Sequence, residues 1–190
     1  MTIRQITPVL SAAATVLLVP LLLTGCARSG QVAQVASAPP AATASAAPTQ
    51  DPTQAATTQI LAVYTGMRQA QAAAEDAGSV QNVSLGSYAA GKALVAIITA
   101  VGQDASNGWR MVGVPQLDPK VTALDLNGQP PTATVTDCMN VAGWHTVDQF
   151  TGKDITAPSA HSSFVSVSQA QLGQNGWRIT ETEVNRSKSC

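Results

Sequence analysis

The chain has 190 residues, of which 11% are charged and 45% are hydrophobic, and its formal net charge is −1. With 10 basic against 11 acidic residues, the sequence has no basic face of the kind that nucleic-acid-binding proteins present. No metal or cofactor is expected, because the cysteines have no histidines nearby and no glycine-rich phosphate loop or calcium loop occurs. These observations leave a small binding, structural or enzymatic domain.

The first 25 residues have the composition of a secretory signal peptide. A start with one positive charge is followed by an apolar run over residues 6–23. A membrane-spanning helix is the alternative, since about twenty apolar residues span a bilayer. However, Pro8 and Pro20 oppose such a helix, and no basic cluster follows the run. We therefore expect residues 1–25 to direct export and to be removed.

The run ends in Leu23-Thr24-Gly25-Cys26, which resembles the lipobox of bacterial lipoproteins. In a lipobox, small residues before the cysteine let the lipidation and cleavage enzymes reach the backbone. The resemblance implies that Cys26 becomes the first residue of the mature chain and carries a diacylglyceryl group on its sulfur. Two or more acyl chains on one residue anchor a protein stably. The expected location is the extracytoplasmic face of the cell membrane, through a lipid anchor.

Two cysteines remain once Cys26 is set aside, namely Cys138 and Cys190. An even pair in an oxidising compartment indicates a disulfide rather than a metal site. The sequence therefore predicts a Cys138–Cys190 bond, which would stabilise the fold by roughly 4 kcal/mol in the chain-entropy model.

Residues 26–50 start with the lipidated cysteine and continue as a low-complexity linker. The segment is almost wholly Ala, Ser, Pro, Thr, Gln and Val, and no spacing in it would bury one face. Such a composition is typical of a flexible tether. The sequence therefore predicts a folded domain over residues 51–190, held away from the membrane surface.

This domain is predicted to open with a long helix. Asp51 can accept hydrogen bonds from free backbone N–H groups, and Pro52 suits the first helical position. Apolar residues then recur at steps of three and four up to Ala74, and Gly78 is suited to end the helix. The polar residues expected on the opposite, solvent-facing side are Gln59, Arg68, Gln69 and Glu75.

Two weaker helical patterns follow, over residues 85–90 and 93–101, and Asn107-Gly108 ends this helical half. The pattern then changes to short β-branched or aromatic runs separated by Pro, Gly, Asn and Asp, which predicts strands. Residues 144–155 are expected to form a further strand or a hairpin. The other predicted strands are residues 109–114, 121–126, 132–138, 163–168 and 177–184.

Helices followed by strands indicate an α+β domain, with N-terminal helices packed on one face of an antiparallel sheet. The order of elements, the Asn-Gly-Trp-Arg-Ile opening of the last strand at residues 175–179, and the two cysteines together resemble the NTF2-like, or SnoaL-like, cone fold of many exported actinobacterial lipoproteins. The resemblance covers roughly residues 51–190 and implies a strongly curved sheet. Most members of that family bind or scaffold and a few are enzymes, so the fold alone does not assign an activity.

Five residues are candidates for a pocket inside such a cone: Tyr64, Tyr88, Asp137, Trp144 and His145. Enzymes of this family use an aspartate or histidine base, often with tyrosines that bond a substrate oxygen. No short Asp/His motif of this chain matches at the family's spacing, and a general base needs hydrogen-bond reach to its substrate. No catalytic residue is therefore assigned.

The sequence thus predicts an envelope lipoprotein whose domain is a binding or protein-interaction module. Its partners would be the membrane, through the lipid on Cys26, and an envelope protein or a small apolar ligand, but no nucleic acid. The alternative is a tethered cone-fold enzyme of the isomerase or dehydratase kind, which a cavity holding Asp137 or a histidine beside a tyrosine would favour. A cone filled by large apolar side chains would exclude it. Three tryptophans, Trp109, Trp144 and Trp177, are expected to fill the core, and the alternative for them is to line an apolar pocket or a partner surface.

Overall fold

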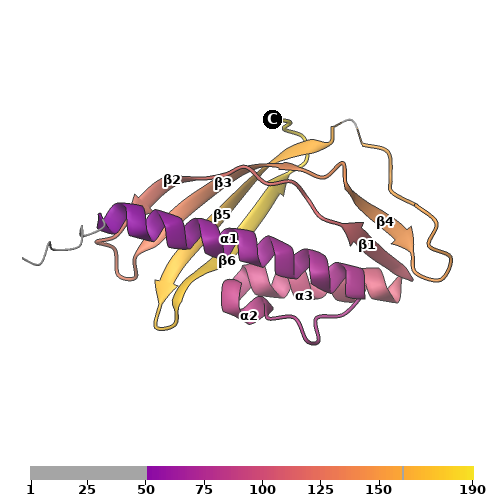
Figure 1. The fold of residues 1–190 in the computed structure, drawn as a ribbon, viewed down its shortest axis with the longest axis horizontal. Helices are drawn as coiled ribbons and strands as arrows, with labels where there is room; N and C mark the ends of the chain where they lie inside the picture. Colours follow the sequence, from indigo (N-terminus) through magenta and orange to yellow (C-terminus); the bar gives the residue numbers. More distant parts are fainter. Residues whose placement is uncertain (1–50, 160) are drawn as a thin grey trace, which may run out of the picture. The chain divides into compact units, whose positions relative to one another are not determined.

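The computed structural model describes residues 51–159 and 161–190. This part of the chain is an α+β arrangement of three helices packed against antiparallel sheets, as the sequence predicts (Figure 1). All three helices precede the strands. In chain order the elements are α1 (Pro52–Ala77), α2 (Leu85–Tyr88), α3 (Gly91–Ser106), β1 (Trp109–Gly113), β2 (Pro119–Asp125), β3 (Thr132–Asn140), β4 (Trp144–Asp148), β5 (Ser163–Gly173) and β6 (Gly176–Asn185).

The first helix begins and ends where the sequence predicts. The Oδ1 atom of Asp51 accepts a hydrogen bond of 2.8 Å from the backbone N–H of Thr53, and Pro52 is the first helical residue. At the other end Gly78 adopts the left-handed conformation, with φ 61°, and its N–H bonds to the carbonyl of Glu75. With 26 residues, α1 is roughly 40 Å long, enough to cross several strands.

The strands form two sheets, whereas the sequence predicts a single one. One sheet has four antiparallel strands in the order β2-β3-β5-β6, and β1 pairs antiparallel with β4 in the other. Two backbone hydrogen bonds between Gln116 and Asn140, of 2.8 and 2.9 Å, connect the chain after β1 to the end of β3. The two sheets are therefore linked but separate.

A close approach of two glycines marks the corner between the sheets. Gly113, the last residue of β1, has φ 88°, and a Cβ atom there would overlap the carbonyl oxygen of Gly143. Gly143 lies in the short turn between β3 and β4. Because a side chain at residue 113 would push this turn away, the glycine at residue 113 allows β4 to leave the four-stranded sheet and pair with β1.

One face of the four-stranded sheet is covered by helices. Figure 1 shows α1 lying across the strands; α1 packs against β1, β2 and β6, and α3 packs against β6 and β1. Alternate residues of β3 point into this core, as a strand requires. The large apolar side chains of the core include Ile60, Tyr64, Met67, Val101, Val135, Trp177 and Ile179.

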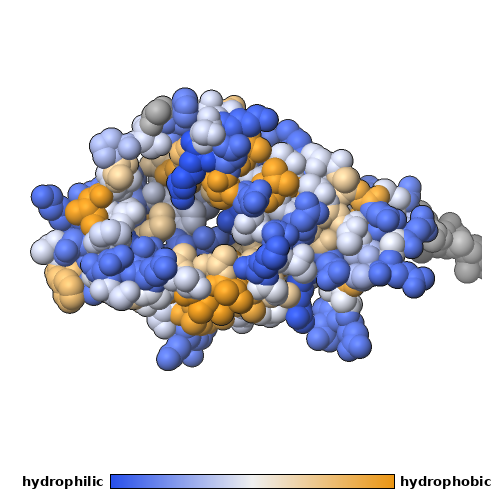
Figure 2. All heavy atoms as spheres, turned by 180° about the vertical axis from the view of Figure 1, so that it is seen from behind, coloured by the Kyte–Doolittle hydropathy of each residue, from blue (hydrophilic) through white to orange (hydrophobic). Residues whose placement is uncertain are grey.

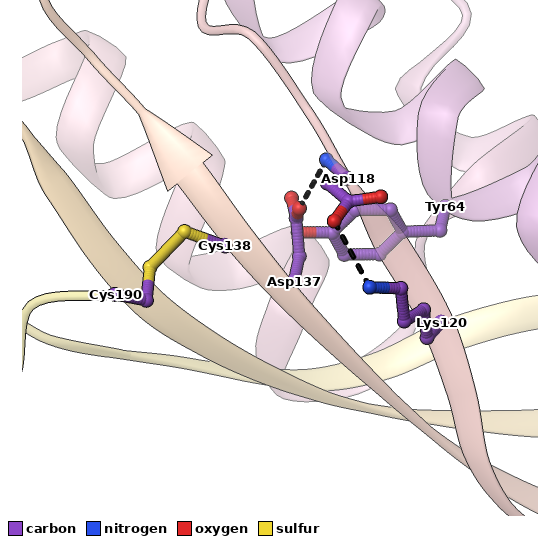
Figure 3. Close-up of a disulfide and its surroundings, with 6 residues drawn as sticks. All are labelled: Tyr64, Asp118, Lys120, Asp137, Cys138 and Cys190. Atoms are coloured by element: carbon purple, nitrogen blue, oxygen red, sulfur yellow. Dashed lines mark hydrogen bonds and ion pairs between the residues drawn. A yellow bond between two sulfur atoms is a disulfide. The ribbon is translucent and has the colours of Figure 1, made fainter.

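The opposite side of β3 carries the disulfide. Cys138 and Cys190 are bonded, with their Cα atoms 5.8 Å apart, which confirms the predicted pairing. Figure 3 shows the consecutive residues Asp137 and Cys138 pointing to opposite sides of the strand, the aspartate toward Tyr64 and the cysteine toward Cys190. The disulfide thus fastens the C-terminal tail to the face of the sheet that the helices do not cover.

The predicted signal peptide, the lipidation site Cys26 and the linker up to residue 50 lie outside the described residues. They stay predictions from the sequence. No helix of residues 51–159 and 161–190 combines the length and the apolar character needed to cross a membrane.

Candidate functional site

A pocket of about 510 Å³ lies between the helices and the β1–β4 sheet. Helices α1 and α3 contribute to it, as do β1, β4, residues at the ends of β3, β5 and β6, and the segment 155–159. Figure 2 shows the surface hollowed on the face opposite to the one in Figure 1. The volume falls within the range of small-molecule sites in proteins, roughly 300–1,000 Å³.

Apolar side chains form most of the pocket wall. Trp144 and Phe164 are 7% and 3% exposed, so their rings are firmly held. Trp109 is 41% exposed, and the expectation that it fills the core is wrong: it lines the pocket instead, whereas Trp177 is buried as expected. The large apolar lining residues are Trp109, Met111, Met139, Val141, Trp144, Ile155, Phe164 and Val184.

One helix supplies a polar side to this pocket. Arg68, Gln71 and Glu75 of α1 are spaced by three and four residues, so they lie on the same face of the helix. Arg68 Nη1 donates to Gln71 Oε1 at 3.0 Å, and Gln71 Nε2 donates to Glu75 Oε1 at 3.0 Å. The other charged lining residues are Asp104 of α3 and Arg186, which follows β6. The pocket is therefore apolar with a polar strip along α1.

Glu75 is a lining residue whose carboxyl has a strongly raised pKa. The residue is 4% exposed, and burial raises the pKa of its carboxyl from the ordinary 4.5 to about 7. The charge of Asp104 raises this pKa further, while the hydrogen bond from Gln71 and the charge of Arg68 oppose the shift. Near neutral pH the carboxyl of Glu75 is thus available in both its protonated and its ionised form.

A buried pair, Tyr64 and Asp137, lies beside this polar strip. The hydroxyl of Tyr64 donates to Asp137 Oδ2 at 2.8 Å, and Asp137 Oδ1 accepts a bond of 2.7 Å from the backbone N–H of Asp118. Figure 3 shows the tyrosine ring and the aspartate pointing toward one another. Burial raises the pKa of the Tyr64 hydroxyl, so this hydroxyl stays protonated and continues to donate. The pair joins α1 to β3.

Arg68 extends this network to two further strands. Its Nε donates to the Tyr64 hydroxyl at 3.2 Å. Its Nη2 donates to Ser166 Oγ of β5 at 2.7 Å and to Thr182 Oγ1 of β6 at 3.0 Å. Since Arg68 is 3% exposed, these partners replace the water that a guanidinium would otherwise bind.

The predicted pocket residues do not all meet. Trp144 lines the pocket described above, and Tyr64 and Asp137 do not, because their polar groups bond each other inside the core. Asp137 is 1% exposed. A cavity holding Asp137 beside a tyrosine, which would have favoured the enzyme alternative, is therefore absent from the described part of the chain.

Tyr88 and His145 also lie away from this pocket. Tyr88 packs on α1, so close to Gly66 that a Cβ atom there would overlap its ring. His145 Nδ1 lies 3.2 Å from Asp154 Oδ2, and both side chains are largely exposed. Among residues 51–159 and 161–190, no cluster of three or more His, Cys, Asp and Glu side chains could hold a metal ion.

Two residues of the site, Arg68 and Glu75, do not lie where the sequence predicts. The sequence predicts both on the solvent face of α1, and this is wrong, because both are buried. A signal was present in the spacing: Ile60, Tyr64, Arg68, Gln71 and Glu75 follow one another at steps of four, four, three and four. The apolar stripe of the helix therefore continues as a polar one on the same face.

Comparison with known proteins gives little. No protein-family model and no curated protein matches the chain. Among solved structures, the chain is similar to the one titled "Crystal structure of intermembrane space region of chloroplast protein ARC6", with a TM-score of 0.47 and 14% sequence identity. The match covers 72% of this chain and 98% of that one. A likeness at this level carries no inference about fold family or function.

Tyr64→Phe should lower the free energy of unfolding by about 2 to 3 kcal/mol, because Asp137 Oδ2 and Arg68 Nε–H would lose a partner while staying buried. Urea denaturation checks this. Tyr88→Phe is the matched control: the Tyr88 hydroxyl takes part in none of the hydrogen bonds among the described residues, so its removal should change stability by less than about 0.5 kcal/mol. Equal losses in the two variants would contradict the role given to the network.

Stability should also depend on the protonation of Glu75. The pKa of its carboxyl is raised in the folded state to about 7, so the folded state binds the proton more tightly than the unfolded one. The resulting stability is fully present below pH about 4.5 and is lost as the pH rises through about 7. Relative to Glu75→Gln, the wild-type chain should lose roughly 2 to 3 kcal/mol over this window in urea titrations. The control is Asp76→Asn, at an exposed neighbour, which should leave the pH dependence of the wild-type stability unchanged. If the free energy of unfolding of Glu75→Gln changes with pH in parallel with that of the wild type, this account is wrong.

Proposed function

We propose that this chain is an extracytoplasmic lipoprotein of the cell envelope, whose NTF2-like domain over residues 51–190 binds a small apolar ligand. The pocket of about 510 Å³ between α1, α3 and the β1–β4 sheet is the observation that carries the proposal. A filled interior would have left no such site. An apolar wall with a few polar groups is typical of ligand sites that take their affinity from burial and their orientation from hydrogen bonds.

The arrangement of elements supports the NTF2-like part of this proposal. A long helix, a short helix and a third helix precede the strands, and this order of elements is part of the resemblance to the family. The four-stranded sheet contains register shifts at Val121/Ala123 and at Gln169/Ala170. Such irregularities increase local bending and twist, as a cone requires.

The envelope location rests on the N-terminal sequence and on the disulfide. A disulfide is typical of proteins that fold outside the cytoplasm, so the Cys138–Cys190 bond supports export. The anchor itself rests on the likeness of Leu23-Thr24-Gly25-Cys26 to a lipobox. A protein-interaction role for the same domain is compatible with this location.

A tethered enzyme is the second proposal, and Glu75 favours it. A carboxyl with a pKa of about 7 inside an apolar pocket has the properties of a general acid or base. Tyr64, Asp137 and His145 do not line that pocket, so catalysis there would depend on Glu75. The binding proposal needs no such step and explains the same pocket.

Filling the pocket should weaken the binding of an apolar ligand. The experiment uses the purified full chain with Cys26→Ser, to which Ala100→Phe is added. The added ring lies in the pocket wall and should weaken binding of the neutral dye Nile red at least fivefold, which corresponds to a loss of roughly 1 kcal/mol. Ala73→Phe is the matched control, since Ala73 is an exposed residue of α1 outside the pocket. Dye fluorescence measures affinity, and circular dichroism confirms folding. Equal dye affinity in the two variants would place the binding site elsewhere.

Cys26→Ser should release the chain from the membrane fraction, because the substituted residue cannot carry the thioether-linked acyl chains that would hold it there. Fractionation of cells followed by immunoblotting measures this. The double substitution Cys138→Ser/Cys190→Ser should stay in the membrane fraction, since neither residue bears lipid in the proposal. Membrane association that survives Cys26→Ser would refute this anchor.

A further inference from the structure

Two residues that line the pocket each have a buried polar atom without a hydrogen-bond partner. Among the described residues, the buried side-chain atoms without a hydrogen bond are Glu75 Oε2, Trp144 Nε1 and Arg110 Nε. Glu75 and Trp144 both line the pocket, and both are more than nine-tenths buried. An unpaired buried polar group lowers stability, so two of them at one pocket indicate a function that compensates for the loss.

Each of the two atoms needs a defined kind of partner. The indole N–H of Trp144 can only donate. Glu75 Oε1 already accepts from Gln71, so in the neutral carboxyl Oε2 carries the proton and donates as well. An oxygen with free lone pairs can satisfy either atom, and a purely hydrocarbon ligand satisfies neither.

The charges around the pocket set the charge of the ligand. The guanidinium of Arg68 already donates hydrogen bonds to Tyr64, to Gln71 and to side chains of the sheet. Asp104 of α3 is the acidic group that faces Glu75 from the other helix. Arg186 lies over the ring of Phe164, 5.6 Å from its centroid. Strands β1 and β4 and the segment 155–159 contribute no titratable side chain to the lining.

The groups around Glu75 and Trp144 disfavour an ionised ligand beside these two residues. A ligand carboxylate placed near Glu75 would face two acidic groups, Glu75 and Asp104. A ligand ammonium would have no acceptor at Trp144 and would leave the indole N–H unpaired. A neutral ligand avoids both costs.

We propose that the ligand is a neutral, largely apolar molecule with a carbonyl-type oxygen, which accepts hydrogen bonds from Trp144 Nε1 and from the carboxyl of Glu75. This inference rests on the proposed function, since it names the class of ligand for the same pocket. The apolar wall supplies affinity for the hydrocarbon part. The two donors select molecules that carry the oxygen, because such a site discriminates against analogues that lack it.

The test compares two probes of equal shape, 2-acetylnaphthalene and 2-isopropenylnaphthalene, which differ by a carbonyl in place of a carbon–carbon double bond. Equilibrium dialysis against the full chain carrying Cys26→Ser measures both affinities. At pH about 5.5 the ketone should bind about tenfold more tightly than the hydrocarbon. At pH about 8.5 the preference should fall to about threefold, because an ionised Glu75 cannot donate while Trp144 still can.

Variants assign the preference to each residue. Glu75→Gln keeps a donor that does not titrate, so its preference for the ketone should be the same at both pH values. Trp144→Phe removes the N–H and should reduce the preference about threefold at both. Asp76→Asn, next to Glu75 but exposed and outside the pocket, should behave as wild type.

The outcomes separate this inference from the proposed function. If both probes bind the wild-type chain equally at pH about 5.5, the pocket binds apolar molecules but the proposed oxygen recognition is wrong. If neither probe binds, the proposed function fails and this inference fails with it. A ketone preference that Glu75→Gln and Trp144→Phe leave unchanged at both pH values would also overturn the assignment to these residues.

Discussion

The fold depends on a buried guanidinium. Arg68 lies inside the domain and donates to Tyr64, Ser166 and Thr182, while Tyr64 in turn donates to Asp137. A buried charge is tolerated only when such partners replace water, so α1 must hold one rotation and one position over β3, β5 and β6. The network therefore fixes which residues of α1 face the pocket.

The pocket follows from this rotation and from the separation of the two sheets. With Arg68 directed at the sheet, Gln71 and Glu75 fall one and two turns further along the same face, beyond the strands that Arg68 contacts. The β1–β4 pair separates from the larger sheet where Gly113 and Gly143 meet. The space between the end of α1 and this pair is not filled by side chains, and Trp109, Trp144 and Phe164 line it.

Stability and recognition oppose each other at this site. The unpaired Oε2 of Glu75 and the unpaired Nε1 of Trp144 each cost free energy in the unliganded domain. The Cys138–Cys190 bond lies on the other face of the sheet and stabilises the fold without touching the pocket. Because the disulfide and the core lie apart from the pocket, they can stabilise the domain while the pocket keeps polar groups without hydrogen-bond partners. Functional sites commonly contain such groups.

The sequence by itself determined the local structure of the domain. The caps at Asp51 and Gly78, the change from helices to strands and the pairing of Cys138 with Cys190 all follow from short-range chemistry or from counting cysteines. Only the tertiary structure decided that the strands form two sheets and that Arg68 and Glu75 are buried. A charged residue on a helix is assigned to solvent by its polarity, and the partners that allow its burial, such as Ser166 and Thr182, lie about a hundred residues away. The site consists of such long-range contacts, so periodicity alone could not reveal it.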